Sequence, residues 1–289
     1  MSATNAIVER YDTYALDYAR YWAPVLEPTS GRLLDEVASF VERAEAGSTS
    51  PVRVLDVGSG TGVLALAAAS RWPRAQVVAS DAAGGMLDIA RERARAAGLN
   101  DVERLAFVVG EAASLPLPDA TVDVVVSSFV FQLVPDRLAA LREALRVLRP
   151  GGRLAYVTWL DREARRPFPP TDEFDEAVLE LGVEEPDLEE EVHAGDVPSA
   201  RSAANELRRA GFRRVGARED ELVYQWLVEG YLEYKLAYDE RSLLSRLSDE
   251  QQRQLEESAR ERLGRLPADD FRWHAPIVFA RGERPRQGV

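Results

Sequence analysis

A glycine-rich segment near residue 60 has the composition of a loop that holds an anionic ligand. It reads VLDVGSGTG over residues 54–62. Glycine lets the backbone turn sharply and approach a ligand where a Cβ would clash, and a helix that follows offers free N–H groups to an anion. A dinucleotide-binding fingerprint needs a glycine at position 63, which is Val63, and the Gly-Lys-Ser/Thr of a phosphate-binding P-loop is also absent. The segment therefore predicts an anion site that matches neither fingerprint.

A second chemical signal is Asp81, which follows the next apolar run, 21 residues after Gly60. A carboxylate at the carboxyl end of a strand can accept two hydrogen bonds from the hydroxyls of a ribose. Taken alone, the residue fits the N-cap of a following helix equally well. Its position downstream of the glycine loop favours ribose binding.

The elements that must position these residues alternate between strand and helix from residue 52 to residue 159. Apolar, β-branched runs predict strands, and apolar residues at three- and four-residue steps predict helices of 10–15 residues. The expected strands are 52–57, 75–80, 105–109, 122–128 and 154–159, and the expected helices are 63–72, 86–97 and 138–148, the last ended by Pro150-Gly-Gly. This alternation indicates a doubly wound, mostly parallel α/β sheet.

Both flanks of this region add helices. Residues 5–46 have helical periodicity, residues 200–210 form a further expected helix, and residues 228–264 read as a helical pair. Two more strands are expected at 214–226 and 271–280, and Pro276 is best tolerated there at an edge or bulge. We therefore expect a Rossmann-like sheet of seven strands, with N-terminal helices and helical insertions after strands five and six.

The motifs taken in order resemble the class I S-adenosylmethionine-dependent methyltransferases, most closely the type 11 small-molecule group related to ubiquinone/menaquinone-biosynthesis methyltransferases. The N-terminal Tyr11-Asp-x-x-Ala-x-x-Tyr18 also resembles the entry helix of that group, and the resemblance fades after Trp159. The matching segments are VLDVGSGTG (54–62), ASD (79–81) with Met86 beyond it, GEAASLPLPD (110–119), VDVVVSSFVFQLVPD (122–136) and LRPGGRLAYVTW (148–159).

The resemblance implies S-adenosylmethionine as the cofactor and a small-molecule methyl acceptor as the partner. Asp81 would bind both ribose hydroxyls, and Asp56 would orient the loop or reach the amino group through water. The glycine loop would hold the methionine part, Ala82 and Met86 would pack on the adenine, Glu111 and Ala112 would bond its edge, and Ser128 and Phe129 would line the transfer channel. The implied cofactor residues are thus Asp56, Gly58, Ser59, Gly60, Gly62, Asp81, Ala82, Met86, Glu111, Ala112, Ser128 and Phe129. The family more often has aspartate at position 111.

The sequence leaves the catalytic residue open. Gln132 stands where this group often has histidine, and glutamine cannot act as a base at neutral pH. The remaining weak candidates are His193, His274 and Tyr18, of which Tyr18 fits a lid or a packed aromatic stripe. Two isolated histidines make no metal site. We therefore expect no metal and an acceptor that is a carbon, an amine or an already acidic oxygen.

Composition excludes several classes of protein. Hydrophobic residues make up 46% of the 289 positions and charged residues 29%, which is typical of a folded protein. The net charge of −13 argues against binding to nucleic acid or an anionic membrane. The absence of cysteine excludes disulfides, thiol nucleophiles and zinc–thiolate sites. The longest apolar stretch, residues 122–134, is too short for a membrane span, and the N-terminus has no signal-peptide pattern. We expect a cytoplasmic, bacterial protein, and the oligomeric state stays open.

These observations favour one methyltransferase domain over residues 1–289. Residues 1–50 would form a helical cap and 51–160 the cofactor-binding core, while 160–200 and 227–265 would form a substrate lid. The predicted activity is methyl transfer to a small, apolar or aromatic metabolite, mainly by positioning and desolvation. The alternatives are a relative that binds S-adenosylmethionine without methyl transfer, whether for another reaction or as a scaffold, and a nicotinamide oxidoreductase, which Val63 disfavours.

Overall fold

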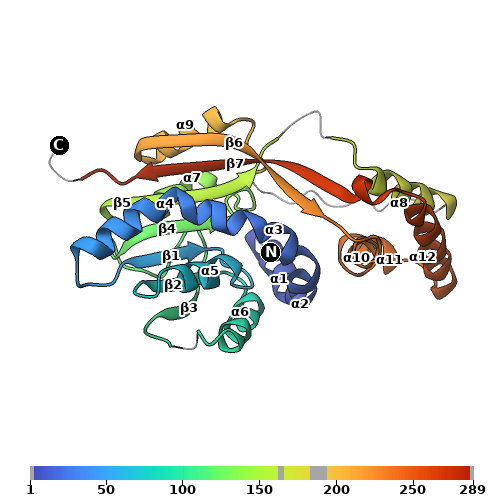
Figure 1. Ribbon diagram of the computed structural model, residues 1–289, viewed down its shortest axis with the longest axis horizontal. Coiled ribbons are helices and arrows are strands. Elements are labelled where there is room, and N and C mark those ends of the chain that lie inside the picture. The colour runs from blue at the N-terminus through green and yellow to red at the C-terminus, as the bar shows by residue number, and fades with distance from the viewer. Residues whose placement is uncertain (1–2, 100, 162–165, 183–193, 287–289) are drawn as a thin grey trace.

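A seven-stranded mixed sheet forms one half of the molecule in the computed structural model, which describes residues 3–99, 101–161, 166–182 and 194–286 (Figure 1). The strand order is β3-β2-β1-β4-β5-β7-β6. The pairs from β3 to β5 are parallel, while β7 runs antiparallel to both of its neighbours. The strands are β1 (Arg53–Val57), β2 (Gln76–Asp81), β3 (Leu105–Val109), β4 (Val122–Ser128), β5 (Leu148–Trp159), β6 (Arg213–Gln225) and β7 (Arg272–Glu283). The expected mostly parallel arrangement of seven strands is thus found, with one strand reversed.

Helices cover both faces of the sheet and bury its central strands. Neighbouring residues of β1 point to opposite faces: Val54 packs in the core under one helical layer and Leu55 in the core under the other, and neither is exposed. A strand covered on both faces has little alternation of polar and apolar residues. The first layer contains α4 (Pro28–Gly47), α5 (Val63–Arg71) and α6 (Gly84–Ala96), and the second contains α7 (Arg137–Val147) and α9 (Ala200–Ala210).

The predicted start of the fifth strand at residue 154 is wrong, because β5 begins at Leu148, directly after α7 (Arg137–Val147). Pro150-Gly-Gly lies inside the span of β5, which already begins at Leu148. Gly151 has φ +85°, and a Cβ at Gly152 would lie 2.8 Å from the carbonyl oxygen of Asp123. The two glycines therefore let the chain turn and pass close beside β4, where any side chain would clash.

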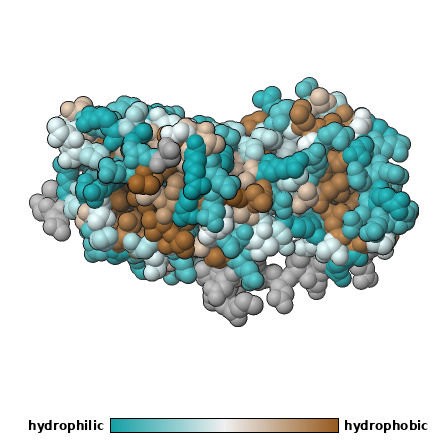
Figure 2. Space-filling model, turned by 90° about the horizontal axis from the view of Figure 1, so that it is seen from below, coloured by the Kyte–Doolittle hydropathy of each residue, from teal (hydrophilic) through white to brown (hydrophobic). Residues whose placement is uncertain are grey.

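The other half of the molecule is a helical bundle that β6 and β7 connect to the sheet (Figure 1). The two strands pair over their whole length, from Arg213 with Glu283 to Gln225 with Arg272. The bundle has its own apolar core, in which Phe174 and Leu255 are fully buried. Its helices are α8 (Pro169–Glu180), α10 (Val228–Tyr234), α11 (Arg241–Leu244) and α12 (Asp249–Gly264). On the face in Figure 2, apolar side chains reach the surface on both halves, among hydrophilic ones.

The N-terminal helices lie between the two halves. They are α1 (Ala3–Thr13), α2 (Ala15–Asp17) and α3 (Ala23–Leu26), with a π-helical turn over Tyr18–Trp22. Asp12 of α1 accepts a hydrogen bond of 2.5 Å from the N–H of Gly85 at the start of α6. Of the helices that the structure describes, none is long and apolar enough to cross a membrane.

Candidate functional site

The carboxyl ends of three strands meet where the strand order reverses. Strand β1 lies between β2 and β4. After β1 the chain adds β2 and β3 on one side of it, and then β4 and β5 on the other side. Open α/β sheets bind their ligands at such a point, because the loops that follow the two neighbouring strands turn apart. The glycine loop follows β1, Asp81 ends β2 and Ser128 ends β4.

The backbone of the glycine loop has left-handed conformations that side chains rarely adopt. Gly58 has φ +68°, and its N–H donates to the carbonyl oxygen of Ser80 at 2.7 Å. A Cβ at Gly58 would lie 2.2 Å from a methyl group of Val130, so the position tolerates only glycine. Gly60, with φ +52°, has Tyr18 as its nearest neighbour at 3.9 Å from such a Cβ. A side chain at position 60 would therefore project into open space above the loop.

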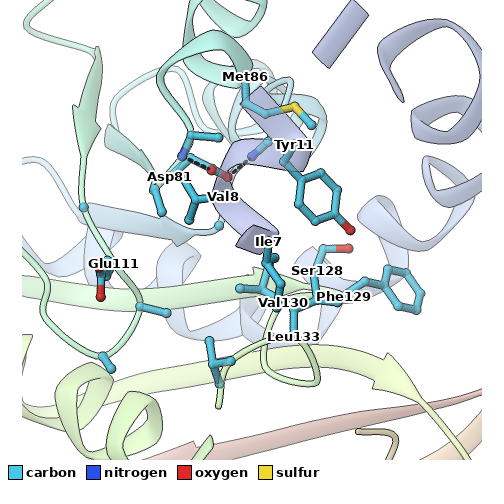
Figure 3. Close-up of a pocket in the computed structure, with 18 of the residues that line it drawn as sticks. Ile7, Val8, Tyr11, Asp81, Met86, Glu111, Ser128, Phe129, Val130 and Leu133 are labelled. Atoms are coloured by element: carbon cyan, nitrogen blue, oxygen red, sulfur yellow. Dashed lines mark hydrogen bonds between the residues drawn. The ribbon is translucent and has the colours of Figure 1, made fainter. Parts of the chain in front are cut away.

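The carboxylate of Asp81 is hydrogen bonded to the backbone of this loop. Its Oδ2 accepts a hydrogen bond from the N–H of Gly60 at 2.7 Å, and its Oδ1 accepts one from the N–H of Ala83 at 2.9 Å (Figure 3). Burial raises the pKa of Asp81, while these two N–H groups counteract the shift. A carboxylate offers about four lone-pair positions, so two remain for a ligand.

A cavity opens above Asp81 and the loop. It measures about 960 Å³ including its open mouth. In Figure 3 the ring of Tyr11, from α1, points toward Ser128, and Glu111 lies on the opposite side of the cavity. The lining residues that the sequence predicted are Tyr18, Gly58, Gly60, Asp81, Ala82, Met86, Glu111, Ala112, Ser128 and Phe129.

A smaller cavity, of about 400 Å³ including its open mouth, lies on the other side of the loop and contains buried polar atoms without partners. Both carboxylate oxygens of Asp56 and the hydroxyl of Ser59 are buried and make no hydrogen bond of normal geometry to a described residue, although the nearby N–H of Ala65 lowers the pKa of Asp56 slightly. Burial, reinforced by the negative charge of Asp81, raises the pKa of Asp56 to about 8. Buried polar groups normally have partners, so these three atoms indicate a polar ligand group or a bound water.

A third cavity, of about 480 Å³ including its open mouth, is lined mainly by aromatic rings. Tyr18 and Phe129 belong to both its wall and the wall of the large cavity, so the two spaces adjoin. The rings of Phe129 and Trp159 lie 4.1 Å apart between centroids. Phe129 has φ +55°, an uncommon conformation for a residue with a side chain, and such strain concentrates at functional sites. The full lining is Tyr11, Tyr18, Trp22, Leu26, Phe129, Gln132, Leu133, Trp159 and Asp196.

The structure separates the candidate catalytic residues. Tyr18 lies at the common wall of the cavities, where burial, with Tyr11 and Tyr238 nearby, raises its pKa well above the ordinary value. His274 lines none of the three cavities, and its Nδ1 lies 2.8 Å from Oε2 of Glu221. His193 lies outside the described residues.

Among the predicted cofactor residues, Gly62 alone lines none of the three cavities. A Cβ there would lie 2.8 Å from Leu66 and 2.9 Å from Ala90, so Gly62 permits close packing of α5 on α6. The sequence analysis missed Ile7, Val8, Val130 and Leu133, which line the large cavity. Ile7 belongs to the helical periodicity of the N-terminus, but only the packing of α1 against α6 brings it to the site.

Part of the chain is similar to known proteins. Residues 55–156 match the family model described as methyltransferase domain. A demethylmenaquinone methyltransferase from Deinococcus radiodurans is 45% identical over 114 residues, which are 39% of this chain and 46% of the relative. A malonyl-[acyl-carrier protein] O-methyltransferase from Methylococcus capsulatus is 35% identical over 166 residues, or 57% and 53%. The chain spans about half the length of the curated relatives that it matches.

Solved structures resemble the fold over most of the chain. The YcgJ protein from Bacillus subtilis superposes with a TM-score of 0.54 at 23% identity, covering 87% of this chain and 98% of that one. The [4+2]-cyclase SpnF superposes with a TM-score of 0.51 at 23% identity, covering 87% and 82%. These likenesses show the fold alone. Residues 55–156, which carry most of the glycine loop, Asp81 and Phe129, match the model of the methyltransferase domain family.

Proposed function

We propose that the protein binds S-adenosylmethionine and transfers its methyl group to a small, apolar or aromatic molecule. The observation that carries this proposal is the adjacency of two different cavities across Tyr18 and Phe129. The large cavity has the polar groups that a nucleoside requires, including Asp81. The third cavity has the aromatic wall that suits an apolar acceptor. The names of the partial relatives, which include methyltransferases of demethylmenaquinone and of malonyl-[acyl-carrier protein], support the same reaction type.

The residues of the large cavity fit the nucleoside part of this cofactor. Asp81 has lone pairs left for two ribose hydroxyls after bonding Gly60 and Ala83. Met86 and Ala82 supply apolar surface for the adenine, and Glu111 stands on the opposite side of the cavity, where it can accept from the adenine amino group. Gly60 leaves free the space that a Cβ would fill.

The residues of the small cavity fit the amino-acid part. Asp56 and Ser59 present three buried oxygens without partners beside the glycine loop. A carboxylate held in a dry site attracts an ammonium group strongly, because few other groups screen or solvate it. We assign Asp56 to the amino group, directly or through a water.

Bound S-adenosylmethionine supplies an electrophilic methyl group, already activated by its sulfonium. The chain then has to align the acceptor with that methyl group and exclude water, and such positioning contributes as much as about 7–11 kcal/mol in ideal cases. Phe129 and Tyr18, at the common wall, are placed to hold the two reactants in contact. The high pKa of Tyr18 keeps its phenol neutral, so it suits positioning rather than proton removal.

We further propose that the chain works as one unit, with the helical bundle as the lid over the acceptor cavity. Trp22, on the wall of that cavity, stacks on Tyr234 of α10 at 5.5 Å between ring centroids. Arg241 of α11 forms an ion pair of 3.1 Å with Asp17 of α2. These contacts support a closed arrangement in which bundle and N-terminal helices cover the site together.

Calorimetric titration with S-adenosylmethionine and S-adenosylhomocysteine tests the cofactor assignment. We expect micromolar binding of both by protein checked for co-purified ligand. Incubation with candidate acceptors, followed by mass analysis, tests the reaction, because methyl transfer adds about 14 Da to the acceptor. Absence of binding would refute the proposal. Binding with a product of unchanged mass would favour a different reaction on the same cofactor, and the fold does not decide this, since SpnF shares it.

A further inference from the structure

The aromatic cavity contains one neutral polar side chain whose orientation the fold fixes. Gln132 follows β4, is 5% exposed and lines the cavity. Its Oε1 accepts a hydrogen bond of 2.9 Å from the hydroxyl of Thr158, a residue of β5 with no exposed surface. In the opposite amide orientation, the Thr158 hydroxyl proton would be buried without an acceptor, which costs free energy. The oxygen of the amide is therefore occupied, and its Nε2 is the group left for a ligand.

The backbone around Gln132 is held as firmly as its side chain. Its carbonyl oxygen accepts from the N–H of Gly195 at 3.0 Å. The buried Arg137 donates to the carbonyl oxygen of Phe131 at 3.1 Å and also bonds the carbonyl oxygen of Gly195. The N–H groups of Gln132 Nε2 make no hydrogen bond to any residue in the described part of the chain. A rigid donor that faces an apolar cavity is a specificity element, because it penalises ligands that leave it unpaired.

Resting on the proposed function, we propose that Gln132 determines acceptor specificity by donating a hydrogen bond from Nε2 to an uncharged oxygen, such as a carbonyl, of a flat apolar acceptor. The rings of Phe129, Trp159 and Trp22 provide the flat walls that such a molecule contacts. The amide of Gln132 is an uncharged donor among aromatic rings, so a charged oxygen would lose its hydration there without gaining a counter-charge from Gln132. The oxygen that Gln132 binds is therefore neutral.

The test compares three probes of nearly equal shape: acetophenone, ethylbenzene and the cation 1-phenylethylamine. Their dissociation constants are measured by ligand-observed NMR, with and without S-adenosylhomocysteine. We expect the wild-type protein to bind acetophenone about five- to tenfold more tightly than ethylbenzene, the effect of one well-placed hydrogen bond. Gln132→Leu should remove this preference while ethylbenzene binding persists.

A second variant tests the direction of the hydrogen bond. Gln132→Glu replaces the donor with an acceptor, so acetophenone should lose its advantage and 1-phenylethylamine should gain affinity about tenfold. A residue that only fills space would not reverse the selectivity in this way. Thr158→Val frees the amide to turn, so it should reduce the acetophenone preference without changing ethylbenzene binding. Gln254→Leu, on the exposed face of α12, serves as the matched control.

An unchanged acetophenone-to-ethylbenzene ratio in Gln132→Leu would overturn the assignment, as would equal binding of the two probes by wild type. Thermal unfolding checks that each variant is folded. Calorimetry with S-adenosylhomocysteine on the same samples separates the two proposals. Failure to bind this nucleoside refutes the proposed function, whereas normal nucleoside binding with an unchanged probe ratio refutes only the role of Gln132.

Discussion

Asp56 and Asp81 stand near the carboxyl ends of neighbouring parallel strands, and only one of the two carboxylates has hydrogen-bond partners. Asp81 accepts from the N–H groups of Gly60 and Ala83, whereas both oxygens of Asp56 are buried without a partner. The difference arises because the glycine loop turns its N–H groups toward β2 and away from β1. Burial therefore raises the pKa of Asp56 to about 8, and a cationic ligand beside it would favour the charged form.

The first prediction concerns the pH dependence of stability. The pKa of Asp56 is about 8 in the folded protein, against an ordinary value of 3.8. Between about pH 4 and pH 8 the folded state thus holds a proton that the unfolded state has released, and stability falls as pH rises. The slope is at most about 1.4 kcal/mol per pH unit. The neutral variant Asp56→Asn should lack this slope.

Urea unfolding of wild type and Asp56→Asn at pH 5.5, 6.5 and 7.5 measures the effect. All other titrating groups are common to both proteins, so the difference between their free energies of unfolding reports Asp56 together with its coupling to Asp81. We expect Asp56→Asn to become relatively more stable as pH increases. Parallel curves for the two proteins would contradict the assigned pKa.

The second prediction is that Asp81→Asn weakens binding of S-adenosylhomocysteine by about 100-fold. The amide keeps the shape of the side chain but loses the charge and two acceptor positions, and a hydrogen bond to a charged group contributes about 1.5–3 kcal/mol. Calorimetry measures the affinity. Asp88→Asn is the matched control, because Asp88 is exposed on α6 and forms an ion pair with Arg91 there. Equal loss in both variants would point to a general effect of charge.

The third prediction separates occupation of the cavity from backbone strain. Gly60 and Gly98 both have positive φ, +52° and +72°, so Gly→Ala at either costs about 1–2 kcal/mol of stability. A Cβ at Gly98 meets nothing within 4 Å, whereas one at Gly60 enters the ligand space. Gly60→Ala should therefore abolish nucleoside binding, and Gly98→Ala should lower only the melting temperature. Intact nucleoside binding by Gly60→Ala would show that the ligand does not occupy the space beside Gly60.

The fourth prediction concerns the buried Arg137. It bonds the carbonyl oxygens of Phe131 and Gly195 and pairs with Glu206 at 3.2 Å. Arg137→Ala leaves these acceptors without a donor, which should cost about 3 kcal/mol in the free energy of unfolding. Arg142→Ala on the exposed side of the same helix should change stability by less than about 0.5 kcal/mol. Denaturant unfolding of both variants measures the difference. Similar free energies of unfolding for the two variants would contradict a stabilising role of Arg137.

The sequence alone predicted the sheet, the glycine loop and Asp81. Buried strands have continuous apolar runs and glycine loops have a fixed composition, so β3 and β4 begin and end at the predicted residues. The glycine loop and Asp81 were identified because their chemistry depends on residue type and on position after a strand. These are local properties, and a linear pattern records them.

Only the tertiary structure decided what closes the site and what faces the acceptor. The packing of α1 on α6 brings Ile7 and Tyr11 over the large cavity, and the long pair β6 and β7 carries a helical bundle to the N-terminal helices. The bond between Gln132 and Thr158 joins residues 26 positions apart on neighbouring elements. No pattern along the chain records which partner a polar side chain meets, because that depends on the register of β4 and β5. The sequence thus determined the glycine loop and Asp81, and three-dimensional packing decided the aromatic wall to which we assign the acceptor.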